Sequence, residues 1–200
     1  MKVAIILKTP LLEDVVREEY VIYADAAYKF AQNITDKKVL GVVGDFDSLG
    51  YCPQDVKVVR LNKEKDFTDG ERAIVYAKVC GATEVVIYGA LGGRIEHILG
   101  NIALLGVAEK VGIKASIVSG GSTAELVGVG EHIINVRKGD KVSFIPYGGE
   151  CNFLSSSGLY YPLKGVTLTG ADTRGISNEA LADKVTFAIT TGKAIVIYGK

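Results

Sequence analysis

The sequence predicts a protein with two parts of different fold class, an α/β part followed by an all-β part. Over residues 1–118, apolar runs rich in valine and isoleucine alternate with segments of helical periodicity. Nearly continuous apolar runs are typical of parallel strands that helices cover on both faces. After Ser119-Gly120-Gly121 the runs are short and turn residues separate them. We therefore expect a Rossmann-like open parallel sheet with helices over residues 1–120 and a small β-sandwich over residues 121–200.

The α/β part is expected to contain two helices and six strands. A helix after Phe67 is marked by Thr68 and Glu71, which form a capping box, and by Gly81, which stands where a C-terminal glycine cap belongs. A second helix is expected from about Arg94. The expected strands are Val3–Leu7, Tyr20–Ala24, Val39–Val43, Val56–Leu61, Val85–Tyr88 and Ala115–Val118.

The helix expected from Arg94 carries two faces of different character. Apolar residues at helical spacing predict a buried stripe, and a polar strip lies on another face, with one end pointing at the carboxyl edge of the sheet. The stripe consists of Ile95, Ile98, Leu99, Ile102 and Leu105, and the strip of Arg94, His97 and Asn101.

The all-β part is predicted from short strand-like runs separated by glycine, proline, aspartate and asparagine. No long amphipathic helix is expected there, and the pair Gly120-Gly121 is the expected boundary. The expected strands are Glu125–Val129, His132–Val136, Lys141–Pro146, Val166–Thr169, Val185–Thr190 and Ala194–Tyr198.

Composition excludes several classes of partner. Lysine plus arginine equals aspartate plus glutamate, at 23 each, so the charge balance gives no reason to expect nucleic acid or an anionic membrane. No apolar run approaches the length of a membrane-spanning helix, and the segment Met1–Lys8 is interpreted as the first strand rather than a signal peptide. The 3 cysteines show no ligand or disulfide spacing, which favours reduced thiols in a cytoplasmic protein.

Acidic residues gather where the expected strands end and where the first helix begins. Asp45 and Asp47 are separated by one residue, so in an extended chain both side chains would point the same way and offer hard oxygen ligands to Mg²⁺. Aspartate pairs also occur in ordinary turns, and acidic residues in a first helical turn can merely complement the helix dipole. The acidic set is Asp25, Asp45, Asp47, Asp66, Asp69 and Glu96.

A glycine-rich segment, Gly89–Arg94, bridges a strand and the following helix. Glycines let backbone N–H groups approach phosphate oxygens, and Arg94 can add a forked, permanently charged contact. By itself the segment could be a tight turn, and His97 a packed or capping histidine. A polyphosphate needs a divalent cation to approach the acidic rim. The combination predicts metal-assisted chemistry on a phosphorylated substrate.

Five short motifs together resemble the thiamin pyrophosphokinase family, in the family's order and over nearly the whole chain. They are Gly44-Asp45-Phe46-Asp47-Ser48, Asp66-x-Thr68-Asp69, Gly89-Ala90-x-Gly92-Gly93-Arg94-x-x-His97, Ser157-Gly158-Leu159-x-Tyr161-Pro162-Leu163 and Gly175-Ile176-Ser177-Asn178-Glu179. The resemblance implies a thiamin diphosphokinase, which transfers pyrophosphate from ATP to the hydroxyl of thiamin and releases AMP.

The resemblance also implies a division of labour. Residues 1–120 would form the catalytic domain that binds ATP and Mg²⁺, residues 121–200 would bind thiamin, and a homodimer would build composite sites at its subunit interface. Asp45, Asp47 and Asp69 would bind the metal and take part in catalysis, with Glu96 as a further catalytic residue. Thiamin would contact Ser177 and Asn178. The residues that would bind ATP are Asp25, Asp66, Thr68, Gly92, Gly93, Arg94 and His97.

The chain departs from the family pattern at a few positions. Glu96 stands where the family usually has aspartate, Ala26-Ala27 where it has two glycines, and the chain has 0 tryptophans, so a tyrosine would have to stack on thiamin. Two other functions are compatible with parts of the sequence. One is a metal-dependent nucleotide-sugar transferase, which would explain the Asp-x-Asp pair alone, and the other is a binding protein of the same fold without turnover.

Overall fold

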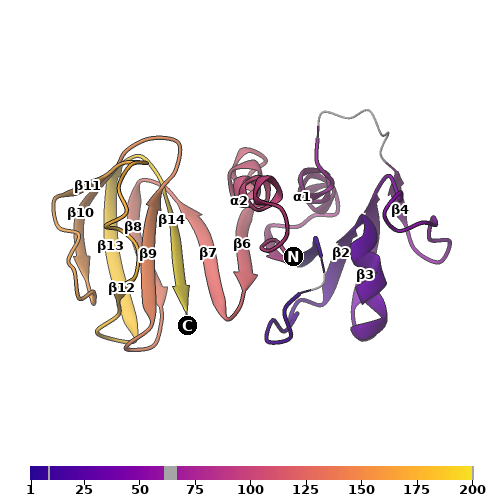
Figure 1. Cartoon of the computed structure of the whole chain (residues 1–200), viewed down its shortest axis with the longest axis horizontal. Helices are drawn as coiled ribbons and strands as arrows, with labels where there is room; N and C mark the ends of the chain where they lie inside the picture. Colours follow the sequence, from indigo (N-terminus) through magenta and orange to yellow (C-terminus); the bar gives the residue numbers. More distant parts are fainter. Residues whose placement is uncertain (9, 61–66, 200) are drawn as a thin grey trace. The chain divides into compact units, whose positions relative to one another are not determined.

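The computed structural model describes residues 1–8, 10–60 and 67–199, and the chain divides into two compact units, residues 1–120 and 121–200 (Figure 1). The first unit combines a parallel sheet with helices, and the second contains antiparallel strands. Among the described residues, no helix combines the length and apolar character that crossing a membrane requires.

The first unit is built on parallel strands in the order β6-β5-β1-β2-β3-β4. Every strand expected there is confirmed, with ends that differ by a few residues, and the expected end at Leu61 lies outside the described residues. The strands are β1 (Lys2–Ile6), β2 (Tyr20–Ala24), β3 (Lys38–Gly44), β4 (Val58–Arg60), β5 (Glu84–Tyr88) and β6 (Lys114–Ser119). The centres of these strands are buried, as expected for strands with covered faces, except in β4, where Val58 and Val59 are half-buried and Arg60 is exposed.

Three helical segments pack on this sheet: η1 (Asp25–Asn33), a 3-10 helix that was not predicted, α1 (Asp69–Val79) and α2 (Ile95–Lys110). η1 contacts β2 and β3, α1 contacts β1, β2 and β3, and α2 contacts β6 and α1. The start of α1 is confirmed, because the Thr68 side chain accepts a hydrogen bond from the Glu71 backbone N–H at 3.2 Å. Its end is also as expected, with Gly81 at φ +86°.

The apolar stripe predicted on α2 is largely wrong. Leu105 is buried, but Ile98 and Ile102 are half-buried, and Ile95 and Leu99 are 73% and 63% exposed. The buried residues of α2 lie in its second half, where the helix packs against β6. The first turns instead border a cavity, described below. Helical spacing shows which residues share a face, and it does not show what covers that face.

The second unit contains two antiparallel sheets that share one core. One sheet has the order β12-β9-β14-β7 and the other β11-β10-β13-β8. The rings of Phe144, Phe153 and Phe187 meet in the core, with centroids 5.1 and 5.4 Å apart for the pairs that Phe144 makes. The strands are β7 (Ser122–Val127), β8 (Gly130–Asn135), β9 (Lys141–Pro146), β10 (Cys151–Ser157), β11 (Val166–Leu168), β12 (Asn178–Glu179), β13 (Lys184–Thr191) and β14 (Ala194–Gly199).

Two of these strands were not predicted. β10 ends in three serines, which read as a loop, although Cys151 and Phe153 alternate into the core. β12 has only 2 residues and is too short to give a periodic signal. The expected strand Glu125–Val129 is also displaced, because β7 starts at Ser122 and ends at Val127.

Candidate active site

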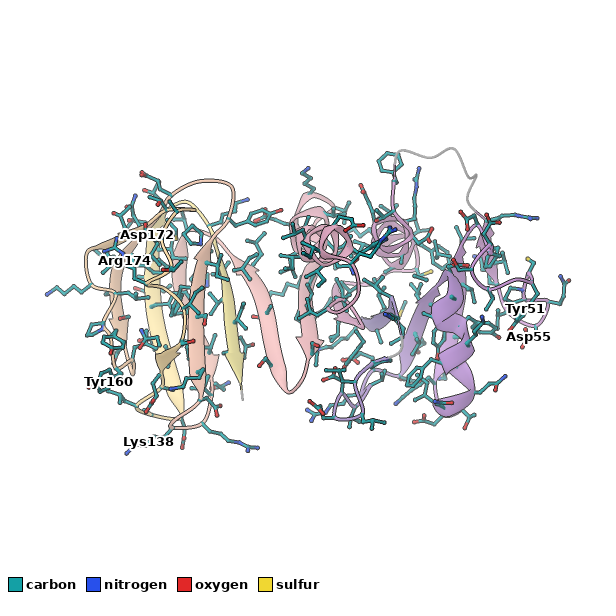
Figure 2. The ribbon with its side chains drawn as sticks, in the orientation of Figure 1. Tyr51, Asp55, Lys138, Tyr160, Asp172 and Arg174 are labelled. Carbon is teal, nitrogen blue, oxygen red and sulfur yellow. The ribbon has the colours of Figure 1, made fainter. Side chains whose placement is uncertain are left out.

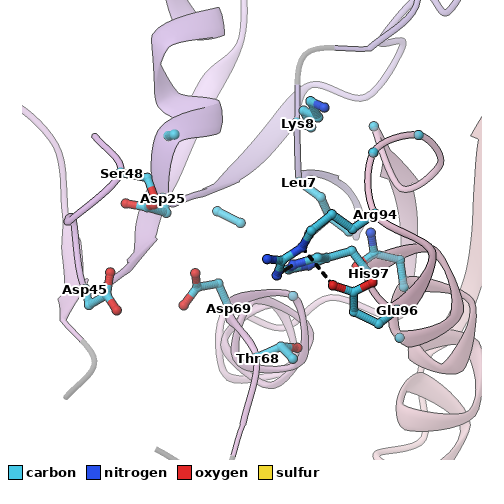
Figure 3. A pocket seen from close by; sticks show the side chains of 18 of the residues that line it. Leu7, Lys8, Asp25, Asp45, Ser48, Thr68, Asp69, Arg94, Glu96 and His97 are labelled. Carbon is cyan, nitrogen blue, oxygen red and sulfur yellow. Dashed lines mark hydrogen bonds and ion pairs between the residues drawn. The ribbon is translucent and has the colours of Figure 1, made fainter. Parts of the chain in front are cut away.

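The first unit contains a cavity of about 1000 Å³ at the carboxyl ends of its parallel strands (Figure 3). Most of the predicted site residues of this unit line it, which is the position expected for ligands of an open parallel sheet. Those residues are Asp25, Asp45, Asp47, Thr68, Asp69, Gly92, Gly93, Arg94, Glu96 and His97. Asp66, predicted with them, lies outside the described residues.

Asp25 directly follows β2 and lies in the wall of the cavity. Its backbone has φ +43°, and the residue is 8% exposed. The neighbouring position on β3 favours glycine, because a β-carbon on Gly44 would lie 3.0 Å from the Asp25 Cβ and one of the two would have to shift. The Asp25 Oδ1 is buried and has no hydrogen-bond partner among the described residues. A buried acceptor of this kind suits a ligand that brings a donor or a cation.

Asp45 and Asp47 reach the cavity by a different geometry from the one predicted. The prediction assumed an extended chain, but β3 ends at Gly44 and Phe46 has φ +66°. Phe46 is buried, and the Asp47 backbone N–H donates to the Asp45 Oδ1 at 3.2 Å, so the segment is a turn. The turn anchors its aromatic residue in the core and leaves both carboxylates lining the cavity.

The segment from Gly89 to Arg94 is a turn built on glycines. Gly89, Gly92 and Gly93 all have positive φ, at +67°, +103° and +91°. The turn is fastened to α2, since the Asn101 side-chain amide donates to the Ala90 carbonyl at 2.7 Å. The backbone at Gly92 and Gly93 can therefore approach a ligand closely.

Arg94 makes its contacts with the polar residues that follow it on α2. Its Nε lies 2.8 Å from the Glu96 Oε1, and its guanidinium contacts the His97 Nε2 (Figure 3). The Arg94 and Glu96 side chains are 72% and 67% exposed, so water screens the ion pair and its net contribution is small. Arg94 can exchange this partner for an anionic ligand at low cost.

Several lining residues were not predicted as site residues. Lys8 and Ser48 are exposed polar residues of the cavity wall, and Phe67 adds an aromatic ring. Lys8 lies two residues after the end of β1, and Asp25 lies one residue after the end of β2, so position relative to a strand end was a usable signal. It was overlooked because no recognised motif contains it.

Ser177 and Asn178 belong to the second unit. Ser177 is exposed, has φ +60°, and its N–H donates to the Ser143 Oγ at 2.9 Å. Asn178 is 5% exposed. Its Oδ1 accepts hydrogen bonds from the N–H groups of Tyr161 and Glu179 at 3.0 and 2.9 Å, and its Nδ2 donates to the Tyr161 carbonyl at 2.7 Å. The Asn178 side chain therefore holds the backbone beside an exposed aromatic pair.

That aromatic pair is Tyr160 and Tyr161, whose rings are 4.8 Å apart in an edge-on arrangement. Both are mostly exposed, and Tyr160 lies at the surface of the second unit (Figure 2). Exposed aromatic rings whose backbone is fixed by a buried amide are suited to contact a flat or cationic ligand.

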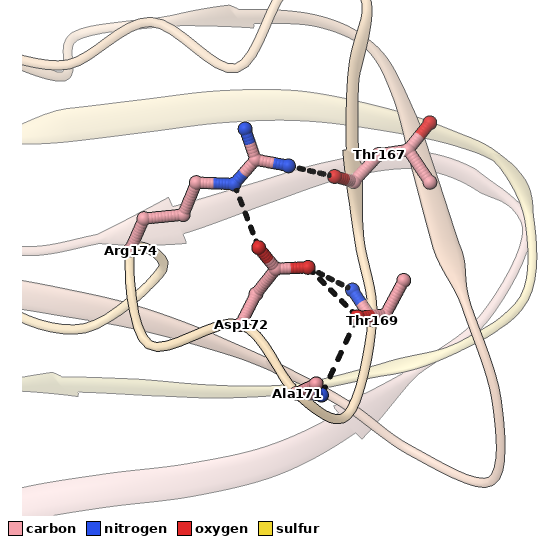
Figure 4. A network of polar contacts seen from close by, with 5 residues as sticks. All are labelled: Thr167, Thr169, Ala171, Asp172 and Arg174. Carbon is pink, nitrogen blue, oxygen red and sulfur yellow. Dashed lines mark hydrogen bonds and ion pairs between the residues drawn. The ribbon is translucent and has the colours of Figure 1, made fainter.

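The loop that leads to Ser177 is ordered by a second polar network (Figure 4). Asp172 Oδ2 accepts hydrogen bonds from the Thr169 N–H and Oγ1, each at 2.8 Å, and its Oδ1 lies 3.1 Å from the Arg174 Nε. The Arg174 guanidinium also donates to the Thr167 carbonyl. The hydrogen bond from the Thr169 backbone, with help from its hydroxyl and from Arg174, holds the pKa of Asp172 below its usual value.

The described residues contain no group of three or more histidine, cysteine or carboxylate side chains close enough to cage a metal ion. The donors of the cavity are nonetheless hard oxygens, and the Asp25 Oδ1 is buried without a partner among the described residues. Mg²⁺ commonly uses one or two carboxylates and completes its shell with water and substrate phosphates. The residues present fit that mode of binding and do not fit a cage made by protein alone.

A parallel α/β sheet with carboxylates and a Gly-Gly-Arg turn at its strand ends is typical of enzymes that transfer phosphoryl groups. Comparison with known families specifies which enzymes. The profile described as "Thiamin pyrophosphokinase, catalytic domain" matches residues 13–117, and the profile "Thiamin pyrophosphokinase, vitamin B1 binding domain" matches residues 131–194. The chain belongs to the thiamin pyrophosphokinase family.

Individual relatives agree with this membership. Thiamine pyrophosphokinase of Bacillus subtilis (strain 168) is 33% identical over 163 residues, which cover 77% of this chain and 75% of the relative. A crystal structure of thiamine pyrophosphokinase from Bacillus subtilis has a TM-score of 0.86 and 26% identity, covering 100% of this chain and 99% of that one. The structure from Candida albicans shows the same fold, with a TM-score of 0.80 at 14% identity over 99% of this chain and 88% of that one.

The resemblance noted in the sequence motifs is thus confirmed. The chain is a transferase of the kinase type that forms thiamin diphosphate from thiamin, with ATP as the pyrophosphate donor of this family. This membership argues against a nucleotide-sugar transferase and against a binding protein without turnover.

Proposed function

We propose that the enzyme holds ATP and Mg²⁺ in the cavity of residues 1–120 and thiamin on residues 121–200. In this proposal the first unit is a Rossmann-like catalytic domain and the second a β-sandwich that binds thiamin. The observation that carries it is the meeting of separate motifs, Asp45-x-Asp47, Thr68-Asp69 and Gly92-Gly93-Arg94, around one cavity of about 1000 Å³. That volume can hold a nucleotide.

The acidic side of the cavity would hold the metal. Asp45, Asp47 and Asp69 are the proposed ligands of Mg²⁺; one or two of them at a time, with water and substrate phosphates, would hold the ion, which would neutralise charge on the transferring phosphates when bound. Asp25 is proposed to contact the bound ATP, because its buried side chain lines the same cavity. Asp66 is assigned to ATP on its motif alone.

The other side of the cavity would hold the phosphates. Thr68 and the backbone of Gly92 and Gly93 can donate hydrogen bonds, and Arg94 supplies a forked cation. In the transfer, the thiamin hydroxyl oxygen forms a bond to the β-phosphorus while the bond from that phosphorus to the oxygen of the α-phosphate breaks and AMP leaves. Glu96 is the proposed group that orients the hydroxyl and takes its proton, and His97 supports Arg94.

Thiamin would lie on the surface formed by Ser177 and the backbone that Asn178 organises. The Tyr160 and Tyr161 rings take the place of the missing tryptophan as candidate stacking partners of the thiazolium cation. Asn178 contributes through the loop it holds, since its amide already bonds the backbone of Tyr161 and Glu179.

The enzyme is further proposed to be a cytoplasmic homodimer with composite active sites. The exposed Ile95 and Leu99 on α2, beside the cavity-lining residues of the same helix, are consistent with a partner that covers this face. A test mixes an Asp47→Asn protein with a Ser177→Ala/Asn178→Ala protein, each first shown to be inactive alone, under conditions of confirmed subunit exchange. Composite sites predict that activity reappears in the mixture, and sites within one chain predict none.

The central test is release of AMP that depends on both thiamin and MgATP. We expect Glu96→Asp to retain activity and Glu96→Gln to lose most of it, because the proposed role requires a carboxylate. Equal activity of the two variants would reduce Glu96 to a partner of Arg94. Absence of thiamin-dependent AMP release from the unsubstituted enzyme would refute the proposed function itself.

A further inference from the structure

The side chain of Lys8 lies in the cavity, and none of the motifs assigned above includes it. Lys8 is exposed and lines the cavity at the end of β1 (Figure 3). Its Nζ lies 3.8 Å from the point that a β-carbon on Gly93 would occupy. The ammonium group is therefore beside the Gly92-Gly93 turn, where backbone N–H groups are available to an anion.

The backbone of Lys8 is fixed more firmly than its side chain. The Leu7 N–H donates to the Tyr88 carbonyl at 3.0 Å, which extends the pairing of β1 with β5 beyond the end of β1. Gly89 then packs directly on Lys8, because a β-carbon there would lie 2.1 Å from the Lys8 carbonyl oxygen. A fixed backbone with an exposed, long side chain presents a cation at a defined place while the ammonium can still follow a ligand.

The charges around the cavity give this lysine a specific use. Among the described lining residues, the lysine and arginine side chains are those of Lys8 and Arg94. Arg94 is paired with Glu96 in this structure. The remaining ionised groups of the wall are carboxylates, which repel phosphate; they are Asp25, Asp45, Asp47, Asp69 and Glu96. A polyphosphate entering this cavity therefore gains from a further cation beside the Gly92-Gly93 turn.

We propose that Lys8 binds the phosphate chain of ATP as a second cation beside Arg94. The proposal rests on the proposed function for the identity of the ligand. Lys8 supplies a point charge with three donors, whereas Arg94 supplies a fixed fork. Lys8 can thus stay in contact with the pyrophosphate group while that group moves from AMP to the acceptor hydroxyl.

The experiment measures binding of MgATP and of adenosine by calorimetry in the absence of thiamin. Lys8→Met removes the charge and keeps much of the apolar stem, and Lys8→Arg keeps the charge. We expect Lys8→Met to weaken MgATP binding by about tenfold or more, the size of a lost charged hydrogen bond, and to leave adenosine binding unchanged. Lys8→Arg should retain most of the MgATP affinity.

A matched control is Lys110→Met, which removes an exposed lysine at the end of α2, outside the cavity wall, and should bind MgATP normally. Unchanged MgATP affinity of the folded Lys8→Met variant would overturn the proposal. Equal loss of adenosine and MgATP binding would also overturn it, since Lys8 would then shape the cavity. The proposal would also be overturned if Lys8→Met bound Mg²⁺ more strongly and nucleotide unchanged, because Lys8 would then serve only to offset the charge of the carboxylates. Thiamin-dependent AMP release by the unsubstituted enzyme tests the proposed function separately.

Discussion

The two units use polar side chains in opposite ways. In the first unit, the polar side chains at the ends of β1, β2 and β3 face a cavity, and glycines such as Gly44 and Gly89 make the backbone contacts that position them. In the second unit, Asn178 and Asp172 bond the backbone of their own loops. Removing a polar side chain should therefore affect chemistry in the first unit and stability in the second.

The largest expected effect is that of Asp47→Asn on turnover. Asp47 is exposed in the cavity wall, so the fold should remain intact while a charge proposed to hold Mg²⁺ is lost. We expect turnover to fall by about two orders of magnitude or more, because electrostatic stabilisation of transferring phosphoryl groups is a large term. Steady-state assays at limiting Mg²⁺ measure the effect.

The control for this variant is Asp55→Asn in the same unit. Asp55, which is labelled in Figure 2, accepts a hydrogen bond from the Tyr28 hydroxyl at 3.2 Å and is not among the residues that line the cavity. Its loss should leave turnover near normal. If Asp47→Asn behaves like Asp55→Asn, the metal assignment is wrong.

The next effect is on stability, from Gly89→Ala compared with Gly50→Ala. Both glycines have positive φ, at +67° and +83°, so both changes carry the same backbone penalty of about 1 kcal/mol. A β-carbon on Gly50 meets nothing within 4 Å, whereas one on Gly89 meets the Lys8 backbone. We expect Gly89→Ala to lose about 2 kcal/mol or more beyond Gly50→Ala in urea unfolding. Equal losses would show that the contact between β1 and β5 can relax.

A smaller and more diagnostic pair is Asn178→Ala and Ser177→Ala in the second unit. Asn178 is buried with hydrogen bonds to Tyr161 and Glu179, so its loss should cost about 2–3 kcal/mol of unfolding free energy. Ser177 is exposed, and its loss should leave unfolding unchanged and raise the KM for thiamin. If Asn178→Ala is as stable as the parent, the contrast between the two units fails.

The smallest expected effect is the pH dependence due to Asp172. Its pKa is lower in the folded protein than in the unfolded chain, so it contributes stability above the unfolded pKa and loses it as the pH falls through the folded value. The free energy of unfolding of the parent should therefore fall more on acidification below about pH 4 than that of Asp172→Asn. Denaturant midpoints across that range measure the difference. Parallel curves would mean that the hydrogen bonds from Thr169 do not depend on the charge.

The strands of the first unit could be predicted closely because continuous apolar runs report burial directly. β10 could not be predicted in this way, because the serines at its end give no apolar signal and its buried residues are only Cys151 and Phe153. The stripe on α2 failed for another reason: the sequence identified an apolar face, but the first turns border the cavity and not the sheet.

Most of the residues predicted for the candidate site line one cavity, although the geometry that brings them there differs from the predicted one. The spacing of Asp45 and Asp47 suggested an extended chain, yet the positive φ of Phe46 and its burial make a turn that exposes both carboxylates. Lys8 could have been found by the strand-end rule that found Asp25. The backbone contacts of Asn178 could not have been predicted, because a sequence motif does not show which groups a side-chain amide bonds. The roles of Ser177 and Asn178 toward thiamin remain predictions.

The contact between Gly89 and the Lys8 carbonyl also has a genetic consequence. Every single-nucleotide change that replaces a glycine introduces a β-carbon or a stop codon, and a β-carbon at position 89 collides with backbone rather than with a side chain that can turn away. A second mutation cannot remove a carbonyl oxygen. Position 89 should therefore tolerate no replacement in lineages that keep this strand pairing, whereas a replacement of Gly50 meets open space and carries only the cost of its positive φ.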